Sequence, residues 1–180
     1  MRIARGLLAT LVLVGACTTL TTGSDYDRAA DFSAYRSYAW LPRAHAHVQN
    51  PLNVRRVEEA IQAELEAKGL KLEPDRAHAD LTVDFTLGSR ERIDVTSYPV
   101  EYRGPWGWGM PYFGSEVDVH QYREGTLAID IFDAKSHRPV WHGWAKKPLA
   151  KADLENPGPS LRAAVAAVLA RFPPAPAAAR

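Results

Sequence analysis

A strand–turn–strand pattern between Gly125 and Ala145 constrains the fold of this 180-residue chain more than any other sequence feature. Apolar residues alternate with other residues from Leu127 to Phe132, Asp133 to Arg138 supplies a polar turn, and a second strand runs from Val140 to Ala145. We expect this hairpin to form the centre of a β-sheet, because its register keeps the apolar partners on one face. The expected cross-strand pairs are Ile131 with Trp141, Ile129 with Gly143, Leu127 with Ala145, Phe132 with Val140, Asp130 with His142, and Ala128 with Trp144.

The first residues have the features of a bacterial secretory signal. Two arginines precede an apolar run from Leu7 to Ala16, which is too short to cross a bilayer and ends in small residues. The only cysteine of the chain, Cys17, follows directly, in a sequence that resembles the lipobox of bacterial lipoproteins. This resemblance implies cleavage before Cys17 and attachment of acyl chains to it, which would anchor the protein to a membrane. The alternative is an ordinary signal peptide, followed by a Cys17 thiol that carries no lipid.

The expected localisation of the protein is the periplasmic face of the outer membrane. Thr18 follows the cysteine, and not the aspartate that resembles an inner-membrane retention signal. Removal of residues 1–16 leaves 164 residues (180 minus 16), which is enough for one domain with a sizeable core. It also removes two of 22 basic residues, so 20 basic residues stand against 21 acidic ones, a net charge of −1. This near-neutral balance argues against nucleic acid as a partner.

Composition divides the remaining chain into three parts. Residues 17–24 are small and polar, and we expect them to form a tether between the lipid and the domain. Residues 25–172 carry all further periodic patterns and are expected to form a single domain. Residues 173–180 are rich in alanine and proline and are expected to be a disordered tail.

Two amphipathic helices are expected in the domain. Asn50 and Pro51 provide a cap and a first helical residue, and apolar residues then recur at helical spacing up to Leu65. Gly69 can adopt the left-handed conformation that ends such a helix. A second helix is expected to begin near residues 158–160 and to end before two prolines, while residues 146–156 read as irregular.

The other strands follow from alternation and from turn residues. We expect strands at residues 37–41 and 70–72, and a half-buried strand from Leu81 to Leu87. The parity of this last strand continues to Val95 and resumes at Val117, which indicates one long hairpin that leads to Gly125. The predicted fold class is α+β: a two-layer sandwich with a mixed, mostly antiparallel sheet of about five strands and two helices packed on one face.

Several short segments, in their order along the chain, resemble one family of bacterial lipoproteins. They are DFSAYRSYAWLP near the start, Lys68-Gly69-Leu70, Ala79-Asp80-Leu81, Gly125-Thr126-Leu127 with Asp130, Val140-Trp141-His142-Gly143, and Arg171-Phe172-Pro173-Pro174. On these segments the chain is similar to domain-of-unknown-function family 4136 over nearly all of its mature length. The resemblance implies a lipid-anchored envelope domain, and it brings no established catalytic residues.

The glycine- and proline-rich segment 104–114 is the most informative candidate site. It contains the large apolar residues Trp106, Trp108, Met110, Tyr112 and Phe113. Such residues near a hairpin tip are typical of interface anchors, and we expect them to contact a partner. The alternative is that the segment folds back over Phe132 and Trp144 and covers the sheet face that carries no helix.

Two further groups of residues are candidate chemical sites. His45 and His47 have the spacing of a chelating pair, but neither cysteine nor a carboxylate cluster stands nearby, so no metal is expected. The second group is Asp130 opposite His142, with Ser136 in the adjoining turn. A histidine base oriented by a carboxylate is part of the catalytic site of many hydrolases, but no serine lies in a nucleophile-elbow sequence. An aspartate and a histidine on a sheet face are more often a simple cross-strand pair.

The function expected from the sequence is binding. The mature protein reads as a lipid-anchored periplasmic lipoprotein with an envelope protein as partner, acting as an accessory or scaffold module in envelope assembly or maintenance. We expect no cofactor and no catalytic activity. The alternatives are a small periplasmic hydrolase that uses Asp130 and His142, and a binder of a hydrophobic or glycan ligand through the segment Trp106–Phe113.

Overall fold

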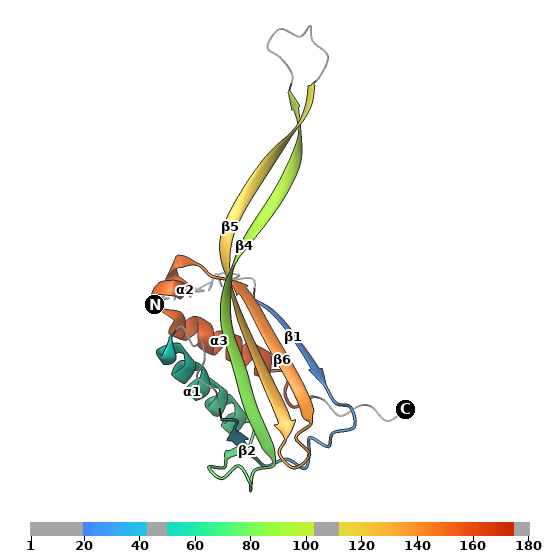
Figure 1. Ribbon diagram of the computed structural model, residues 1–180, viewed down its shortest axis with the longest axis vertical. Coiled ribbons are helices and arrows are strands. Elements are labelled where there is room, and N and C mark those ends of the chain that lie inside the picture. The colour runs from blue at the N-terminus through green and yellow to red at the C-terminus, as the bar shows by residue number, and fades with distance from the viewer. Residues whose placement is uncertain (1–19, 43–49, 103–111, 175–180) are drawn as a thin grey trace, which may run out of the picture.

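The computed structural model describes residues 20–42, 50–102 and 112–174 of the chain. Within these ranges six strands form one sheet, with helices packed against one of its faces (Figure 1). The elements in chain order are β1 (Thr21–Tyr26), β2 (Ser37–Trp40), α1 (Pro51–Ala67), β3 (Lys71–Leu72), β4 (Leu81–Tyr102), β5 (Tyr112–Asp133), β6 (Pro139–Pro148), α2 (Lys151–Glu155) and α3 (Pro157–Leu169). The expected two-layer α+β architecture is confirmed, with six strands where about five were expected.

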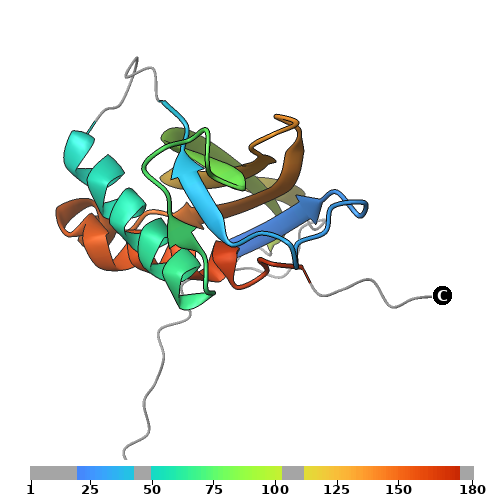
Figure 2. The ribbon, with the colours of Figure 1, turned by 90° about the horizontal axis from the view of Figure 1, so that it is seen from below.

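The sheet has the strand order β1-β6-β5-β4-β2-β3. Strands β1, β6, β5 and β4 pair with their neighbours in antiparallel fashion, whereas β2 pairs in parallel with both β4 and β3. A parallel pair needs a crossover connection, and α1 supplies it between β2 and β3. Figure 2 shows α1 and α3 together on one side of the sheet, so the mixed sheet has one face for the helical layer.

The central hairpin of β5 and β6 has the register expected from the sequence. Leu127 lies opposite Ala145, Ile129 opposite Gly143, and Ile131 opposite Trp141, while Asp130 faces His142 and Ala128 faces Trp144 on the other side of the sheet. One expected pair is wrong. A register shift between Ile131 and Phe132 places Phe132 opposite Pro139 and not opposite Val140, because β6 takes up one additional residue, Val140, after the turn.

Helix α1 begins and ends as its sequence predicts. The Asn50 side chain accepts a hydrogen bond from the Leu52 amide at 3.0 Å, and Pro51 occupies the first helical position. At the other end Gly69 adopts a φ of 87°, and the Leu70 amide donates to the Leu65 carbonyl at 3.0 Å. This is a Schellman end, which satisfies carbonyls that the last helical turn leaves free.

The core lies between the sheet and the helical layer. Its largest fully buried side chains come from β2, α1, β4, β5, β6 and α3: Trp141, Tyr38, Ile61, Leu65, Leu81, Ile129, Ile131 and Leu169. Trp141 lies across Gly143, where a Cβ atom would overlap its ring and approach Val168 of α3 to 2.7 Å. Glycine at this position therefore allows the indole ring and α3 to pack closely on the sheet.

Two elements were not expected from the sequence. Strand β1 begins at Thr21, inside the stretch 17–24 that was expected to be a tether, so the expected domain start at residue 25 is wrong. This strand is held by antiparallel pairing with β6, in which Gly23 lies opposite Trp144 and leaves room for its ring. Helix α2 forms in the segment that was read as irregular, and the Asp153 side chain caps it by accepting from the Ala150 amide at 2.9 Å.

Candidate functional site

Strands β4 and β5 continue far beyond the rest of the sheet as a two-stranded arm, which we define as the strand segments 90–102 and 112–124. Both strands have 22 residues and remain paired from Leu81 with Asp133 to Tyr102 with Tyr112. At about 3.3 Å per residue, the run from Ser89 to Tyr102 corresponds to roughly 43 Å. Figure 1 shows the arm projecting from one end of the body.

Beyond the pair of Glu124 with Pro148, none of the described strands flanks the arm. The last pair between β5 and β6 is Glu124 with Pro148, and the last pair between β2 and β4 is Trp40 with Val83. Both outer edges of the arm thus present backbone amide and carbonyl groups that no third strand of the described chain uses. Such edges are ready templates for pairing with another chain, and an isolated two-stranded hairpin is only marginally stable in water.

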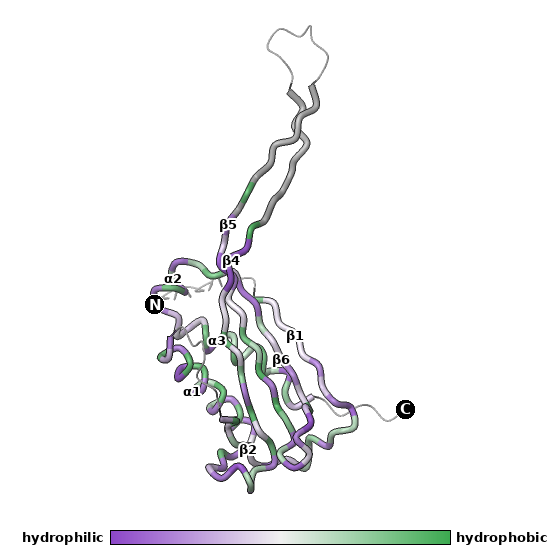
Figure 3. Tube along the Cα trace, in the orientation of Figure 1, coloured by the Kyte–Doolittle hydropathy of each residue, from purple (hydrophilic) through white to green (hydrophobic). Residues whose placement is uncertain are grey.

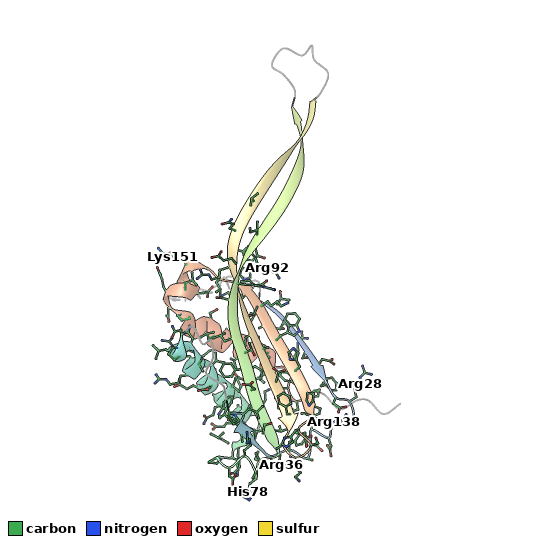
Figure 4. The ribbon with its side chains drawn as sticks, in the orientation of Figure 1. Arg28, Arg36, His78, Arg92, Arg138 and Lys151 are labelled. Atoms are coloured by element: carbon green, nitrogen blue, oxygen red, sulfur yellow. The ribbon has the colours of Figure 1, made fainter. Side chains whose placement is uncertain are left out.

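The base of the arm is fixed by charged side chains across the two strands. Glu124 Oε1 accepts from Arg90 at 2.9 Å and from Arg92 at 3.4 Å, and Arg123 lies 3.6 Å from Glu91. Figure 4 labels Arg92 at this base. The hydrogen bonds from Arg90 hold the pKa of Glu124 below its usual range. The ion pairs therefore connect the two strands at the point where the arm leaves the body.

Beyond this charged base the arm exposes apolar side chains. Ile93 is 60% exposed and Val119 is 53% exposed, and the register places both residues on the same face of the arm. Figure 3 shows the same change, from a hydrophilic base to a short hydrophobic stretch on each strand. An exposed apolar stripe beside unpaired strand edges can bind an extended segment or a strand of another protein.

The structure places only part of the aromatic candidate site. Tyr112 and Phe113 belong to the first residues of β5, at the far end of the arm. Outside the described residues lie Cys17, His45, His47, Trp106, Trp108 and Met110. The alternative that the aromatic segment covers the sheet face around Trp144 also concerns residues outside the described ranges. The lipid attachment and the partner contact stay predictions.

The Asp130 and His142 side chains meet as the sequence predicts. His142 Nδ1 lies 2.6 Å from Asp130 Oδ1, and the side chains are 47% and 34% exposed. Asp25 of β1 lies opposite His142, and Asp84 of β4 lies opposite Asp130, so one row of polar residues crosses four strands. The row lies on the sheet face away from the helices, where such pairs stabilise neighbouring strands.

The turn next to this row does not supply a free nucleophile. The Ser136 hydroxyl donates to Asp133 Oδ1 at 2.8 Å, and the same carboxylate accepts from the Ser136 amide at 2.7 Å. Asp133 also accepts from the Tyr35 hydroxyl, and these hydrogen bonds hold its pKa below the usual range. Within residues 20–42, 50–102 and 112–174, no group of three His, Cys, Asp or Glu side chains could hold a metal ion.

A cavity of about 1010 Å³ lies in the body, at the end from which the arm projects. It opens between the first turns of α1 and α3, helix α2 and the sheet, and sequence reasoning missed it because its walls come from segments that lie far apart in the sequence. Its apolar wall is formed mainly by Leu20, Leu52, Leu87, Leu127, Leu149 and Leu161. Gly125 leaves room for Leu149, since a Cβ atom there would lie 2.9 Å from Leu149 Cδ2.

One buried ion pair stands in the cavity wall. Lys147 Nζ lies 2.7 Å from Asp153 Oδ1 and 3.0 Å from Ser160 Oγ, and the two charged side chains are only 15% and 13% exposed. Burial raises the pKa of Asp153, but the hydrogen bonds from Lys147 and from the Ala150 amide outweigh it and leave the pKa below its usual range. The pair satisfies its own charges, and the leucines form the apolar part of a wall that also contains polar and charged side chains, among them Arg56, Lys146 and Glu155.

Solved structures share this fold at low sequence identity. A PDZ domain protein from Parabacteroides distasonis matches with a TM-score of 0.57 and 18% identity, over 87% of this chain and 36% of that longer protein. A DUF4136 family protein from Bacteroides thetaiotaomicron matches with a TM-score of 0.53 and 16% identity, over 86% of this chain and 96% of its own. PelC from Paraburkholderia phytofirmans, solved as a dodecamer, matches with a TM-score of 0.50 and 13% identity, over 84% and 95% of the two chains.

The sequence comparison identifies the family and leaves the activity open. No curated protein matches the chain. In the part of the chain that the structure describes, no helix is both long and apolar enough to cross a membrane. The family profile described as a domain of unknown function, DUF4136, matches residues 22–174, from the second residue of β1 to the end of the described chain. The chain therefore belongs to the DUF4136 family.

Proposed function

We propose that this protein is a lipoprotein anchored to the periplasmic face of the outer membrane, and that its single α+β domain binds an envelope protein partner as an accessory or scaffold module. The observation that carries the binding role is the arm. It extends roughly 43 Å from the body at about 3.3 Å per residue. It has unpaired edges among the described strands and exposes Ile93 and Val119.

The position of the first described residue supports a partner close to the membrane. Leu20 and Gly125 both line the cavity, and Gly125 lies where the arm leaves the body. Cys17 is only three residues before Leu20, so three residues of chain, about 10 Å when extended, separate the proposed anchor from this end. An arm that starts beside the anchor reaches partners at the membrane surface.

Photo-crosslinking in living cells tests the proposal. A photoreactive amino acid replaces Ile93, Val119, Trp106 or Trp108 in turn, and Leu72 is the matched control because it is an apolar residue, 37% exposed, on the far edge of the body. We expect a discrete adduct from the arm positions and none from Leu72. An adduct of twice the protein's mass would identify a second copy as the partner, a form of assembly that the dodecameric PelC relative illustrates.

Two results would contradict the binding role. One is the absence of any adduct from all four positions, the two on the arm and the two tryptophans. The other is the same set of products from the arm and from Leu72, because the arm would then have no preference over the body surface. Either result would also remove the reason to call the domain a scaffold.

A second candidate function rests on the pair of Asp130 and His142. Its 2.6 Å contact would allow the carboxylate to orient the imidazole as a general base. The partial exposure of both side chains leaves the imidazole accessible, but the nearby Ser136 hydroxyl is held by Asp133. A His142→Ala variant that stays folded and loses hydrolysis of a periplasmic substrate would favour this function over binding.

A further inference from the structure

The exposed large apolar side chains of the described residues gather at few places. Ile93 and Val119 lie on the arm, and Leu72 lies on the edge strand β3. The other two are Leu52 and Leu154, which are 53% and 51% exposed, and both line the cavity. The apolar wall of the cavity thus has the character of a binding site for a hydrocarbon group, because Leu52 and Leu154 remain about half exposed to solvent there.

The size and the chemistry of the cavity fit such a group. Its volume of about 1010 Å³ is at the upper end of the usual range for ligand pockets, which is roughly 300–1,000 Å³. The charged pair of Lys147 and Asp153 in its wall is already satisfied internally and by Ser160. An apolar ligand against the leucines would therefore not deprive this pair of its partners.

We propose that this cavity accepts one hydrocarbon chain of the lipid carried by Cys17. This inference rests on the proposed lipid anchor, and it gives one acyl chain of that anchor a second binding site besides the bilayer. The cavity holds the chain against the leucines of α1, α3 and β5 whenever the chain is out of the bilayer. The domain thereby shields part of its own lipid from water.

Proximity selects this occupant over a free lipid. Leu20 lines the cavity, and Cys17 stands three residues before it, so a chain attached to Cys17 starts within about 10 Å of the wall. A ligand on a short flexible tether has an effective concentration in the millimolar range, which a free lipid in the aqueous periplasm does not reach. The bilayer offers the same hydrophobic gain, so the tethered chain can exchange between the two places.

The test uses the full chain, made in bacteria that are fed a palmitic acid analogue with a diazirine group. The purified protein is irradiated, and mass spectrometry locates the analogue on Cys17 and any adduct inside the same molecule. We expect adducts on peptides that contain Leu52 or Leu161. The variants Leu161→Trp, which fills the wall, and Leu52→Trp, which blocks the mouth, should each lower these adducts at least tenfold.

Controls separate this inference from the anchor itself. Leu72→Trp, a matched change outside the cavity, should leave the adducts unchanged. Leu52 is half exposed, so Leu52→Trp folds even where Leu161→Trp does not. A labelled Cys17 without adducts in the cavity, or with adducts spread evenly over the body, overturns the inference and leaves the anchor intact. An unlabelled Cys17 overturns the anchor, and the inference with it.

Discussion

A deletion of the arm tests whether partner binding depends on the arm and whether the stability of the body does not. Residues 92–122 are deleted, and Glu91 is joined to Arg123 by Asn-Gly, a pair that favours the two-residue turns of hairpins. Glu91 and Arg123 lie directly opposite each other in the register, so the shortened strands can close without a shift. The hydrogen bond from the Leu149 amide to the Arg123 carbonyl, at 2.7 Å, is retained.

The structure predicts a small loss of stability from this deletion. The last buried residue of the core on β5 is Leu127, 3% exposed, and it stays in place together with its partner Leu87. Apart from the pairing within the arm itself, the described contact that disappears is the ion pair of Arg92 with Glu124, and Glu124 keeps its hydrogen bonds from Arg90. An exposed ion pair contributes about 0–1 kcal/mol, so the free energy of unfolding should fall by at most about 1 kcal/mol.

Thermal unfolding followed by circular dichroism measures this loss on the domain without its leader. For a domain of this size, 1 kcal/mol corresponds to about 2–4 °C, so we expect the melting temperature to fall by no more than about 4 °C. The shortened protein should also lose its crosslinking partner in cells. A fall of more than about 10 °C, equivalent to roughly 3 kcal/mol, would refute the view that the arm is free of the core.

Three further predictions concern the body. Gly143→Ala forces a methyl group into the Trp141 ring and should cost about 1–3 kcal/mol in a chemical denaturation experiment, whereas Gly88→Ala, whose nearest neighbour atom lies 3.1 Å away, should cost less than about 1 kcal/mol. Tyr38→Phe removes a buried hydroxyl that has no partner among the described residues, so stability should stay equal or rise by up to about 1 kcal/mol, and a clear loss would reveal a partner. Hydrogen bonds, chiefly from the Arg36 amide, lower the pKa of the Asp80 carboxyl below 3.8 in the folded protein. The charged carboxylate therefore stabilises the fold fully above pH 3.8, and this contribution is lost as the pH falls through the folded pKa. The melting temperatures of the wild type and of Asp80→Asn should converge below pH 3.8.

The elements that the sequence predicted are those with strong local signals. Helix α1 carries its own cap, its apolar stripe and its terminal Gly69, so local rules suffice to place both ends. The central hairpin carries alternation on both strands and a polar turn around Asp133, which together fix the register except at the bulge before Phe132. In both cases the information lies within about twenty residues of sequence.

The elements that the sequence did not predict depend on distant partners. Strand β1 has a polar sequence without alternation, and it forms because β6 offers an edge and because Gly23 accommodates Trp144. Helix α2 has only five residues, too few for a periodic pattern. The cavity combines segments from Leu20 to Leu161, and no local pattern states that their apolar side chains will surround a common space.

The candidate site shows the same division between local and distant signals. Alternation predicted that the strands after Leu87 would continue as a long hairpin, and the pairing up to Tyr102 confirms it. Alternation could not reveal that β4 and β5 would continue without a flanking strand, because this depends on where their neighbours end. Asp130 and His142 could be paired from the register alone, since both lie in the well-defined central hairpin.

The end of β6 explains how the body and the arm are kept apart. Pro148 is the last residue of β6 and lies opposite Glu124, and a proline has no amide hydrogen to extend the ladder. Leu149 adds one last hydrogen bond to β5, from its amide to the Arg123 carbonyl, and its side chain occupies the space that Gly125 leaves in the cavity wall. The residues that end β6 therefore also close one wall of the cavity and leave β5 without a neighbour. One short segment thus creates both features that we propose to act in binding.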